Sequence, residues 1–541
     1  MKLPVLFFSS EAPKLEKYDV KHVTPEESKT FDLYNTLNTF KPVAIITIGK
    51  PWQIYGKVGS LNYHWRRRWL HFDDIKDFKP SAIEGCYATS ALDRNNHTQE
   101  WPYVSVITTA FHSGDKIYRP FKSLQKQSYT NWEWIIFDDS KTDENWELLK
   151  KIKAQDYRIK LYRSDANSGF IGHVKRCASM LAVGKYLVEL DHDDELHPDM
   201  LKWIVDGFRK FPEAKFLWSD CCELYEGTLE NFNYGDHFAY GYGSNYRVKH
   251  GEKYREVTVN PWPNAKSMRH IVGVPNHVRV WETEFYQQIG MHNPHLPVAD
   301  DYELLVRTFL KTKFIHVTEL GYFQYRNQGG NNFTFLRNQL IQELTYLFRM
   351  QYDDKIHERL LELGIGDEVA EKGWLSNPQA WLDDTDNKMR CERELIYKPR
   401  STEVSLILVF NGHMSETMDI IRSVIHQSYD KWELFVIGSG KNRLDEVMDI
   451  LLFEVDDRVR WWNLKDKVPE KIMNQYARKM LVSTEKVIRI KNTLKKSYLS
   501  EFMKEEGGIS TETPKESKQE EGPVDGSQLI QVPKELSSDE E

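Results

Sequence analysis

Cysteine is scarce in this sequence, with 5 residues in 541. No two of the five show the Cys-x-x-Cys spacing of a redox or zinc motif, and an odd number cannot all pair within one chain. The pattern therefore argues against a disulfide framework and favours reduced thiols in a cytosol-like compartment.

Long hydrophobic runs are also missing. No stretch approaches the roughly 18–20 apolar residues that a membrane-spanning helix needs. The short apolar run of residues 1–8 is interrupted by Pro4 and has no small-residue cleavage site, so it is more typical of a first strand than of a signal peptide. We expect a soluble, cytoplasmic protein without a signal peptide or a transmembrane segment, and peripheral contact with a membrane stays open.

An excess of charge of one sign is absent from most of the chain. The formal net charge is -8, and residues 501–541 alone hold 12 Asp and Glu against 4 Lys. The first 500 residues are therefore balanced, with 69 basic and 69 acidic side chains. A balanced body gives no electrostatic reason to expect nucleic acid as a partner.

The chain does contain the pattern of an α/β protein. Apolar, β-branched runs that are typical of buried strands alternate with helical segments, and they cover residues 104–108, 134–137, 159–162 and 186–190. This alternation predicts a mostly parallel sheet with flanking helices. A further run at residues 43–48 predicts a small α/β segment at the N-terminus.

One internal repeat is visible. Residues 123–133 recur as residues 423–433, and residues 104–107 match 404–407, so that both pairs have an offset of 300 residues. Two copies cannot form a solenoid. They indicate that a similar, truncated α/β unit begins near residue 401.

These patterns divide the chain into five predicted parts. We expect a small α/β segment at 1–97, a main domain at 98–340, a helical and polar connection at 341–400, a second unit at 401–502 and an acidic tail at 503–541. The tail is rich in Glu, Lys and Ser with almost no aromatic residues, so it cannot bury enough apolar surface to offset its ordering entropy and should be disordered.

An acidic run, Asp191-His192-Asp193-Asp194, follows directly on the predicted strand that ends at Leu190. Carboxylates at the carboxyl end of a parallel strand face the crevice where open α/β sheets bind ligands. Mg²⁺ or Mn²⁺ typically takes one or two such carboxylates and completes its shell with phosphate oxygens and water. The Asp-x-Asp spacing alone is weak evidence, because an acidic loop after a strand is often a solvated turn. In the same way the earlier pair Asp138-Asp139 could be a turn or a helix cap.

The order of the motifs is more specific than any of them alone. Along the chain the sequence places a strand and its polar end, an acidic pair, an Asn-Ser-Gly stretch and the acidic run, at residues 104–111, 138–143, 167–169 and 190–194. This order, over about residues 101–335, resembles the family 2 glycosyltransferases. The resemblance implies a GT-A fold, in which a nucleotide-binding α/β half is joined to an acceptor-binding half.

The resemblance also implies roles for the residues at the strand ends. Thr109, Phe111 and Asp139 would hold the nucleobase of a nucleotide-sugar, and Asp191 would contact its ribose. Asp193 would bind the metal, Mn²⁺ or Mg²⁺, which neutralises the nucleoside diphosphate as it leaves. We expect two further carboxylates to support this site, at Asp138 and Asp194.

Transfer of a sugar also requires a base that deprotonates the acceptor hydroxyl. The family places the base in an acidic pair at the start of a helix, and Asp300-Asp301 matches, with Asp301 at the base position and Asp300 supporting it. Read from the residues alone, either Asp could instead cap the helix that follows. Both roles can hold at once, with one Asp capping the helix and the other facing the acceptor.

Three further side chains are candidates with a structural alternative. Lys175 stands where many relatives have an Ala-Arg-Asn motif, so a basic residue is kept but its register against the phosphates is in doubt. Arg326 could help to hold the diphosphate or could form a structural ion pair, and His316 could complete the metal shell or belong to the core. The Gln-x-x-Arg-Trp motif of processive synthases is absent, which favours addition of single sugars.

The second unit lacks the acidic positions of the first. At the offset of 300 residues Asp138-Asp139 becomes Gly438-Ser439, and Lys491-Asn492-Thr493 stands where the acidic run should be. These side chains cannot build a cation site. We expect a degenerate, non-catalytic GT-A-like unit.

The whole pattern predicts a metal-dependent, inverting glycosyltransferase. It would transfer a single sugar from a UDP- or GDP-sugar to a hydroxyl of a glycan or glycoconjugate. One alternative is a non-catalytic module that binds a nucleotide or a glycan without turnover. The other is a sugar nucleotidyltransferase, but that class would show a glycine- and lysine-rich loop after the first strand, and residues 109–113 contain none.

Overall fold

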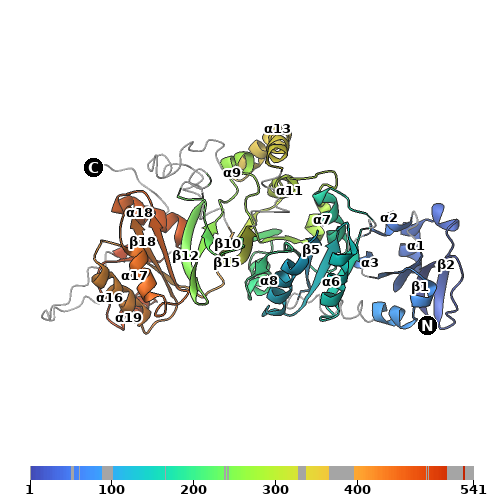
Figure 1. Cartoon of the computed structure of the whole chain (residues 1–541), viewed down its shortest axis with the longest axis horizontal. Coiled ribbons are helices and arrows are strands. Elements are labelled where there is room, and N and C mark those ends of the chain that lie inside the picture. The colour runs from blue at the N-terminus through green and yellow to red at the C-terminus, as the bar shows by residue number, and fades with distance from the viewer. Residues whose placement is uncertain are drawn as a thin grey trace. The chain divides into compact units, whose positions relative to one another are not determined.

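The computed structural model describes residues 2–49, 54–59, 61, 63–66, 68–87, 102–164, 166–236, 239, 243–326, 337–364, 395–482, 484, 486–507 and 528–529. The chain forms two compact units (Figure 1). Unit 1 consists of Met1–Leu217, Val278–Lys313 and Phe333–Phe348, and unit 2 consists of Trp218–His277, Phe314–Asn332 and Arg349–Glu541. Each unit is described by itself.

Unit 1 begins with a small sheet of four parallel strands in the order β2-β1-β3-β4. Its elements are β1 (Leu3–Phe8), β2 (Tyr18–Val23), α1 (Leu33–Phe40), β3 (Ala44–Ile48), α2 (Ile54–Gly59), α3 (Tyr63–Arg66) and β4 (Trp69–Phe72). Alternate residues of β1 enter two separate cores, with Leu6 and Phe8 in one and Val5 and Phe7 in the other. A parallel strand that is buried on both faces reads as a continuous apolar run, which is why the sequence predicts it well.

The main sheet of unit 1 has the strand order β7-β6-β5-β8-β14, in which the first four strands are parallel and β14 is antiparallel. The strands are β5 (Val104–Ala110), β6 (Trp132–Asp138), β7 (Ile159–Arg163), β8 (Tyr186–Glu189) and β14 (Arg279–Glu282). The four predicted strands and the mostly parallel α/β sheet are confirmed. The chain runs outward from β5 to β7 and then returns to β8 on the other side of β5, so the topological switch point lies between β5 and β8.

Helices connect these strands and cover the sheet. They are α5 (Tyr118–Gln125), α6 (Asp143–Lys153), α7 (Ile171–Met180), α8 (Met200–Lys210), α10 (Thr283–Gln288) and α11 (Asp300–Phe309). Helix α7 packs against β5 and β6, and α6 packs against β7 (Figure 1). This arrangement places the carboxyl ends of β5, β6 and β8, and the polar residues that follow them, along one edge of the sheet.

Unit 2 contains a longer sheet. Its hydrogen-bonded neighbours run from β10 to β13, β12, β19, β18, β17 and β20. The strands are β10 (Phe216–Tyr225, in unit 2 from Trp218 on), β12 (Ser244–His250), β13 (Lys253–Val259), β17 (Val404–Val409), β18 (Trp432–Ser439), β19 (Val459–Leu464) and β20 (Val487–Ile490). Shorter pairings add β11 (Asn231–Phe232) and β21 (Gln528–Leu529), and β15 (Phe314–Arg326) pairs with β16 (Leu395–Tyr397).

The register of the strands repeats with the offset of 300 residues. Val104 pairs with Trp132 in unit 1, and Val404 pairs with Trp432 in unit 2. The offset also holds for the other two parallel pairings of each sheet. A buried hydrogen bond repeats as well, because Ser105 Oγ donates to Glu133 Oε1 over 2.5 Å and Ser405 Oγ donates to Glu433 Oε1 over 2.5 Å. The sequence repeat therefore corresponds to a repeat of strand pairing and of core hydrogen bonds.

The outer edge of β19 carries the hairpin of β12 and β13, whose sequence lies in the predicted main domain. Arg247 and Val248 pair with Trp461 and Arg460 in antiparallel register. The Tyr254 hydroxyl on the hairpin donates to the Met448 carbonyl oxygen over 2.9 Å. In the packed unit, the second copy of the repeat thus serves as a support for residues 244–259.

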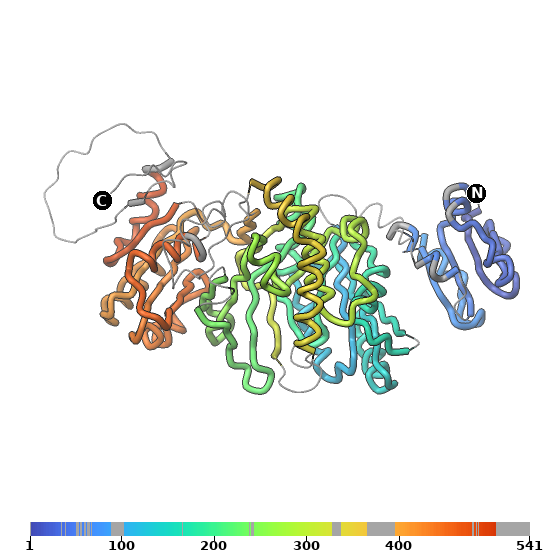
Figure 2. Tube along the Cα trace, turned by 90° about the horizontal axis from the view of Figure 1, so that it is seen from above, coloured from blue at the N-terminus to red at the C-terminus, as the bar shows by residue number. Residues whose placement is uncertain are grey.

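The remaining helices are α9 (Ala265–His270), α13 (Asn338–Glu362), α16 (Met414–Ile425), α17 (Leu444–Leu451), α18 (Glu470–Tyr476) and α19 (Tyr498–Gly507). Helix α13, with 25 residues, is the gold coil in Figure 2. Helix α19 continues to Gly507, which is beyond the boundary at 503 where the disordered tail is predicted to begin.

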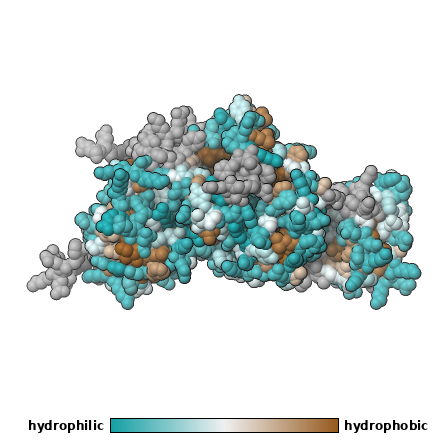
Figure 3. Space-filling model, in the orientation of Figure 1, coloured by the Kyte–Doolittle hydropathy of each residue, from teal (hydrophilic) through white to brown (hydrophobic). Residues whose placement is uncertain are grey.

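Most of the hydrophobic side chains that form the cores are buried. On the face shown in Figure 3 hydrophilic residues predominate, and hydrophobic ones form small separate patches. Within the described ranges, no helix combines the length and the apolar character that crossing a membrane would require.

Candidate active site

The polar end of β5 is fixed to the end of β8 by hydrogen bonds. Thr108 Oγ1 donates to the Leu190 carbonyl oxygen over 2.7 Å, and the Leu190 amide donates to the Ile107 carbonyl oxygen over 3.0 Å. Thr109 and Phe111, the predicted nucleobase contacts, follow at this strand end and are partly exposed. The backbone that leads into the acidic run is therefore rigid, and both predicted contacts are accessible.

The acidic run forms a tight turn after β8. The Asp194 amide donates to the Asp191 carbonyl oxygen over 3.4 Å, and Arg119 Nη1 donates to the Asp193 carbonyl oxygen over 3.0 Å. Asp191 and Asp193 are partly exposed, whereas Asp194 is buried, with an exposed fraction of 2%. Asp194 is thus placed to support the turn, and Asp191 and Asp193 are the carboxylates that can reach a ligand.

Charges of both signs act on the Asp193 carboxylate in this turn. Burial and the neighbouring Asp191 carboxylate raise the pKa of Asp193, while His192, Lys116 and Arg119 oppose this effect. No group of three or more His, Cys, Asp or Glu side chains that could hold a metal ion is found among the described residues. A divalent cation that takes one or two protein carboxylates and otherwise phosphate oxygens needs no such group, so the acidic turn fits Mn²⁺ or Mg²⁺ held together with a diphosphate.

Asp139 anchors the Asn-Ser-Gly loop. Its Oδ2 accepts from Asn167 Nδ2 over 2.8 Å and from Ser168 Oγ over 3.2 Å, and its Oδ1 accepts from the Ser168 amide over 3.1 Å. Gly169 follows with a φ of +71°, a left-handed conformation that glycine adopts without steric strain. This contact explains why the two motifs occur together, and it was not predicted from the sequence.

Asp138 is buried behind the site and forms hydrogen bonds within the turn, so any support that it gives to ligand binding is indirect. Its side chain is fully buried, and its Oδ1 accepts from Ser140 Oγ over 2.6 Å and from Asn145 Nδ2 over 2.8 Å. The Oδ1 atom of the Asn145 side chain accepts in turn from Ser113 Oγ over 2.8 Å. Asp138 therefore joins the loops after β5 and β6. Its carboxylate stabilises the turn, which is the structural role that the sequence left open for Asp138-Asp139.

The acidic pair Asp300-Asp301 opens helix α11. The helix is preceded by Ala299, which has a φ of +57°, and neither Asp is its N-cap residue. Arg279 Nη2 lies 3.0 Å from Asp301 Oδ2, and Asp301 Oδ1 accepts from the Tyr302 amide over 2.7 Å. Burial alone would raise the pKa of Asp301, but Arg279 and Lys175 lower it by more, so it ends below its usual value. The exposed fraction of the Asp301 side chain is 28%, and Asp301 is the accessible member of the pair.

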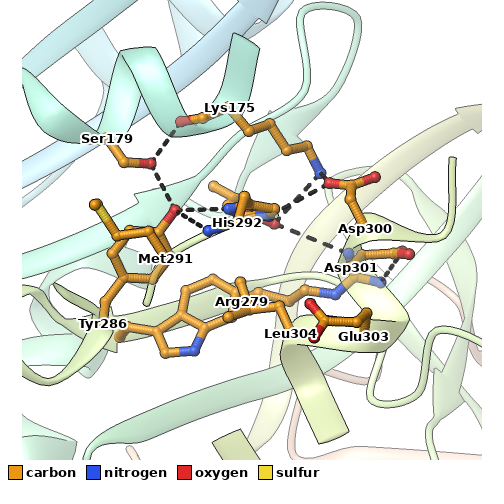
Figure 4. Close-up of polar contacts among 12 residues, drawn as sticks. Lys175, Ser179, Arg279, Tyr286, Met291, His292, Asp300, Asp301, Glu303 and Leu304 are labelled. Carbon is orange, nitrogen blue, oxygen red and sulfur yellow. Dashed lines mark hydrogen bonds and ion pairs between the residues drawn. The ribbon is translucent and has the colours of Figure 1, made fainter. Parts of the chain in front are cut away.

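Asp300 points the other way, into a buried group of charges (Figure 4). Its Oδ2 lies 3.6 Å from Lys175 Nζ and 3.4 Å from His292 Nε2. The same two cationic positions face Glu189, with Lys175 Nζ at 3.8 Å and His292 Nε2 at 2.9 Å. Burial raises the pKa of Asp300, and Lys175 and His292 reduce that effect. Asp300 therefore supports the site from inside the protein.

Lys175 does not lie where the sequence suggested. Its exposed fraction is 8%, and its ammonium faces Asp300 and Glu189. Burial lowers the pKa of Lys175, but these two carboxylates raise it by more, so the side chain stays charged. The expected support of the donor phosphates by Lys175 is thus replaced by an internal ion pair.

A glycine permits this arrangement. Helix α7, which carries Lys175, approaches residues 293–296 so closely that a Cβ atom on Gly172 would lie 2.1 Å from the Asn293 carbonyl oxygen. The Gly172 amide donates to the Leu296 carbonyl oxygen over 3.2 Å. Any other residue at this position would separate the helix from the segment that carries His292.

Lys175 and Arg279 link the acidic turn to the acidic pair. Both cations interact electrostatically with Asp191 as well as with Asp300 and Asp301. The end of β8 and the start of α11 thus belong to one site in unit 1. Asp139 lies at the same sheet edge, and its charge acts on Cys177 of the neighbouring helix α7.

Comparison with known proteins gives a match over part of unit 1. Residues 105–218 match the family model of glycosyl transferase family 2. The similarity to this family is therefore shown for this segment of unit 1. The matched segment of the family 2 domain contains the ends of β5, β6 and β8. It does not extend to Arg279, His292 or the acidic pair of α11.

Individual relatives match over limited segments. A UDP-Glc:alpha-D-GlcNAc-diphosphoundecaprenol beta-1,3-glucosyltransferase, WfaP of Escherichia coli, is 41% identical over 91 residues, which are 17% of this chain and 35% of that protein. The putative colanic acid biosynthesis glycosyl transferase WcaA of Escherichia coli is 28% identical over 215 residues, 38% of this chain and 66% of that protein. The chain thus spans about a third to two thirds of the length of these relatives.

A solved structure, that of S. aureus TarS 1-349 in complex with UDP-GlcNAc, is similar with a TM-score of 0.36 and 15% identity. The similarity covers 52% of this chain and 79% of that one.

Two of the candidate residues, Arg326 and His316, lie in unit 2 and interact with side chains of that unit. Arg326 forms a close ion pair with Glu223, donates to the Tyr234 hydroxyl over 2.8 Å and lies 3.7 Å above the Phe232 ring. It is therefore a structural cation in this unit, which was the alternative reading. His316 is likewise buried: its Nε2 lies 2.7 Å from Asp220 Oδ1, so it belongs to the core.

Three residues of the site were not identified from the sequence. Glu189 and Arg279 stand in apolar strands, where a charged side chain is unusual unless it is paired, and that was the signal that could have found them. His292 lies in the loop between α10 and α11. Nothing in its local sequence marks it, because its partners are distant in the chain.

Proposed function

We propose that unit 1 carries the donor site and the catalytic base of a metal-dependent, inverting glycosyltransferase, which transfers a single sugar from a nucleotide-sugar to a hydroxyl acceptor. One observation supports this above the others. The accessible carboxylate of Asp301 lies in the same charged site as Asp191, in the unit that contains the segment matching glycosyl transferase family 2, and Arg279 at 3.0 Å lowers its pKa.

The donor would be a UDP- or GDP-sugar. Its base would lie against Thr109 and Phe111, next to the loop that Asp139 holds, and its ribose would lie against Asp191. The printed name of the 41% identical relative includes UDP-Glc, which supports a uridine donor. The acceptor would be a glycan or glycoconjugate with a free hydroxyl group.

Asp193 is the residue proposed to hold Mn²⁺ or Mg²⁺. Its partly exposed carboxylate stands in a turn whose backbone is fixed by Arg119. When bound, the cation would supply neutralisation of the diphosphate charge. The carboxylate oxygens of the turn are ligands that these cations prefer. Burial and Asp191 raise the pKa of Asp193, and a bound cation would lower it again.

The proposed reaction needs one proton transfer from the acceptor to the protein. Asp301 accepts the proton of the acceptor hydroxyl while the hydroxyl oxygen forms its bond to the anomeric carbon. The bond between that carbon and the diphosphate oxygen breaks, and its electron pair leaves with the diphosphate. A single displacement of this kind inverts the anomeric configuration. The lowered pKa of Asp301 keeps the carboxylate in the form that can accept a proton.

The second copy of the repeat is proposed to be non-catalytic. At the position of Asp138 it has Gly438, where an added Cβ atom would lie 2.9 Å from Asn463 Oδ1 and 3.0 Å from Asn442 Nδ2. The two Asn side chains are hydrogen-bonded to each other over 2.8 Å. Side chains of the unit itself therefore fill this edge of the sheet.

The proposal is tested by sugar transfer and donor hydrolysis with a panel of nucleotide-sugars, with and without Mn²⁺. Asp301→Asn should lower kcat by about 10²- to 10⁴-fold, because the amide cannot accept the proton of the acceptor hydroxyl. Asp193→Ala should abolish the effect of Mn²⁺ on nucleotide-dependent thermal stability. Asp206→Asn, a partly exposed position on α8 that pairs with Arg209 outside the site, is the matched control and should have wild-type activity.

Two results would contradict the proposal. Full activity in Asp301→Asn would show that another group is the base. Nucleotide binding without turnover of any donor would favour a binding module instead.

A further inference from the structure

His292 is a fully buried residue at the centre of the charged group (Figure 4). Its Nδ1 lies 2.6 Å from the Tyr286 hydroxyl, and its Nε2 lies 2.9 Å from Glu189 Oε1 and 3.4 Å from Asp300 Oδ2. The Tyr286 hydroxyl is also 3.0 Å from Ser179 Oγ. The ring therefore connects two carboxylates on one side with a chain of hydroxyl groups on the other.

The hydroxyl chain determines which atom carries a proton on the Nδ1 side. Ser179 Oγ has one hydrogen, and it donates that hydrogen to the Lys175 carbonyl oxygen over 2.6 Å. The hydrogen between Ser179 and Tyr286 must then come from the Tyr286 hydroxyl. Because Tyr286 has no second hydrogen, His292 Nδ1 must be the donor in its contact with the Tyr286 oxygen.

The carboxylates of Glu189 and Asp300 act on the other ring nitrogen, Nε2. Nε2 lies 2.9 Å from Glu189 Oε1, a distance at which the carboxylate attracts a protonated ring and repels a bare lone pair. Burial raises the pKa of Glu189, but cations that include Lys175 and Arg279 lower it by more, so the pKa lies well below the usual range. With both nitrogens protonated, His292 is an imidazolium cation.

The charge count agrees with this assignment. Three carboxylates, Glu189, Asp300 and the partly exposed Asp301, face the two cations Lys175 and Arg279, and Asp191 acts on the same two cations. The carboxylates therefore outnumber the cations. An imidazolium at His292 reduces this excess of negative charge, which is unfavourable in the interior.

We propose that His292 is a positioning residue that acts as the third cation of the site, and this rests on the proposed function of Asp301 as the base. Arg279 reaches two carboxylates, with Nη2 at 3.0 Å from Asp301 and Nη1 at 3.9 Å from Glu189. As long as His292 satisfies Glu189, Arg279 stays with Asp301 and fixes the orientation of the base. Without the imidazolium, Glu189 draws Arg279 away from Asp301.

The test compares His292→Gln with His295→Gln in the full chain. His295 lies three positions away, is exposed and makes no contact with the charged group, so its variant should match the wild type. His292→Gln should lower kcat by about 10- to 100-fold, the size of effect expected when a catalytic group loses its orientation. The donor KM should stay within about twofold, because the nucleotide contacts are not changed.

The protonation is tested separately by nuclear magnetic resonance of the chain labelled with ¹⁵N-histidine. The signals that disappear in His292→Gln identify the ring, and both of its nitrogens should carry a proton at about pH 7.5. A ring with a single proton overturns the proposal. So does a kcat of His292→Gln within about twofold of the wild type, or a loss that lies only in the donor KM.

A second variant covers the case in which His292→Gln does not fold. Tyr286→Phe removes the acceptor of the Nδ1 proton, which disfavours the imidazolium form while the ring stays in place, so it should lower kcat in the same direction with an unchanged donor KM. Wild-type kcat in this variant overturns the proposal. Asp301→Asn is measured in parallel. If Asp301→Asn is fully active, the proposed function fails, whereas an inactive Asp301→Asn beside a fully active His292→Gln refutes only the role of His292.

Discussion

Replacing Lys175 by Met separates two roles for this side chain. If Lys175 held the donor phosphates, Lys175→Met would weaken nucleotide binding and leave the fold unaffected. The structure instead places its ammonium 3.6 Å from Asp300 and 3.8 Å from Glu189, with 8% of the residue exposed. Lys175→Met, which keeps an unbranched side chain and removes the charge, should therefore affect stability and not nucleotide affinity.

The magnitude follows from the burial of the pair. Removing one partner of a buried ion pair leaves an uncompensated charge and costs about 3–5 kcal/mol. That is a large part of the roughly 5–15 kcal/mol that stabilises a typical domain. Urea unfolding of Lys175→Met should show this loss, and Lys202→Met, which removes an exposed lysine of α8, should not. Lys175→Met/Asp300→Asn restores the charge balance and should recover part of the stability.

The pH dependence has a defined sign. Burial raises the pKa of Asp300 in the folded protein, and Lys175 opposes that effect. A carboxyl group with a raised pKa contributes stability at low pH that is lost as the pH rises. Without Lys175 the pKa of Asp300 rises further, so the deficit of Lys175→Met should be larger at about pH 8 than at about pH 5. Wild-type stability combined with a tenfold loss of UDP affinity, measured by calorimetry, would refute this reasoning and return Lys175 to the phosphates.

Two further substitutions test the strand ends of the two copies. Asp139→Asn should weaken binding of UDP by about tenfold or more, because an amide cannot accept all the hydrogen bonds from Asn167 and Ser168. Each hydrogen bond to a charged group contributes about 1.5–3 kcal/mol. Unchanged UDP affinity in calorimetry would contradict the role of this loop. Gly438→Asp should not create a second nucleotide site. Its Cβ atom would lie 2.9 Å from Asn463 Oδ1, so the variant should be less stable by about 1–3 kcal/mol. It should still bind one nucleotide per chain. Binding of two nucleotides per chain would show that the substitution creates a nucleotide site in the second copy.

The sequence was a good guide wherever the determinants of structure are local. The runs of residues 104–108 and 186–190 predicted β5 and β8 because a strand that is buried on both faces must be apolar throughout. The acidic run was located correctly at the end of β8 for the same reason, since it begins where the apolar run stops. The repeat at an offset of 300 residues also corresponds to the same strand register in both sheets.

The sequence was a poor guide wherever a side chain chooses among distant partners. Asp138 and Asp139 are neighbours of the same type, yet Asp138 is buried in a turn and Asp139 holds a loop 28 residues away in the chain. Lys175 had the expected charge but a different partner. In each case the local pattern fits two roles, and packing selects one of them.

The sequence by itself determined the α/β order of strands and helices, the family of the first copy and the carboxylates that can face a ligand. These follow from apolar periodicity and from motif order along the chain. Only the tertiary structure decided how the charges are paired. Because β14 lies antiparallel to β8, with Val280 opposite Val188, Arg279 comes to lie beside Glu189. Residues from five separate segments therefore meet in one buried group, and since an unpaired charge is so costly there, each takes the partner that the fold provides.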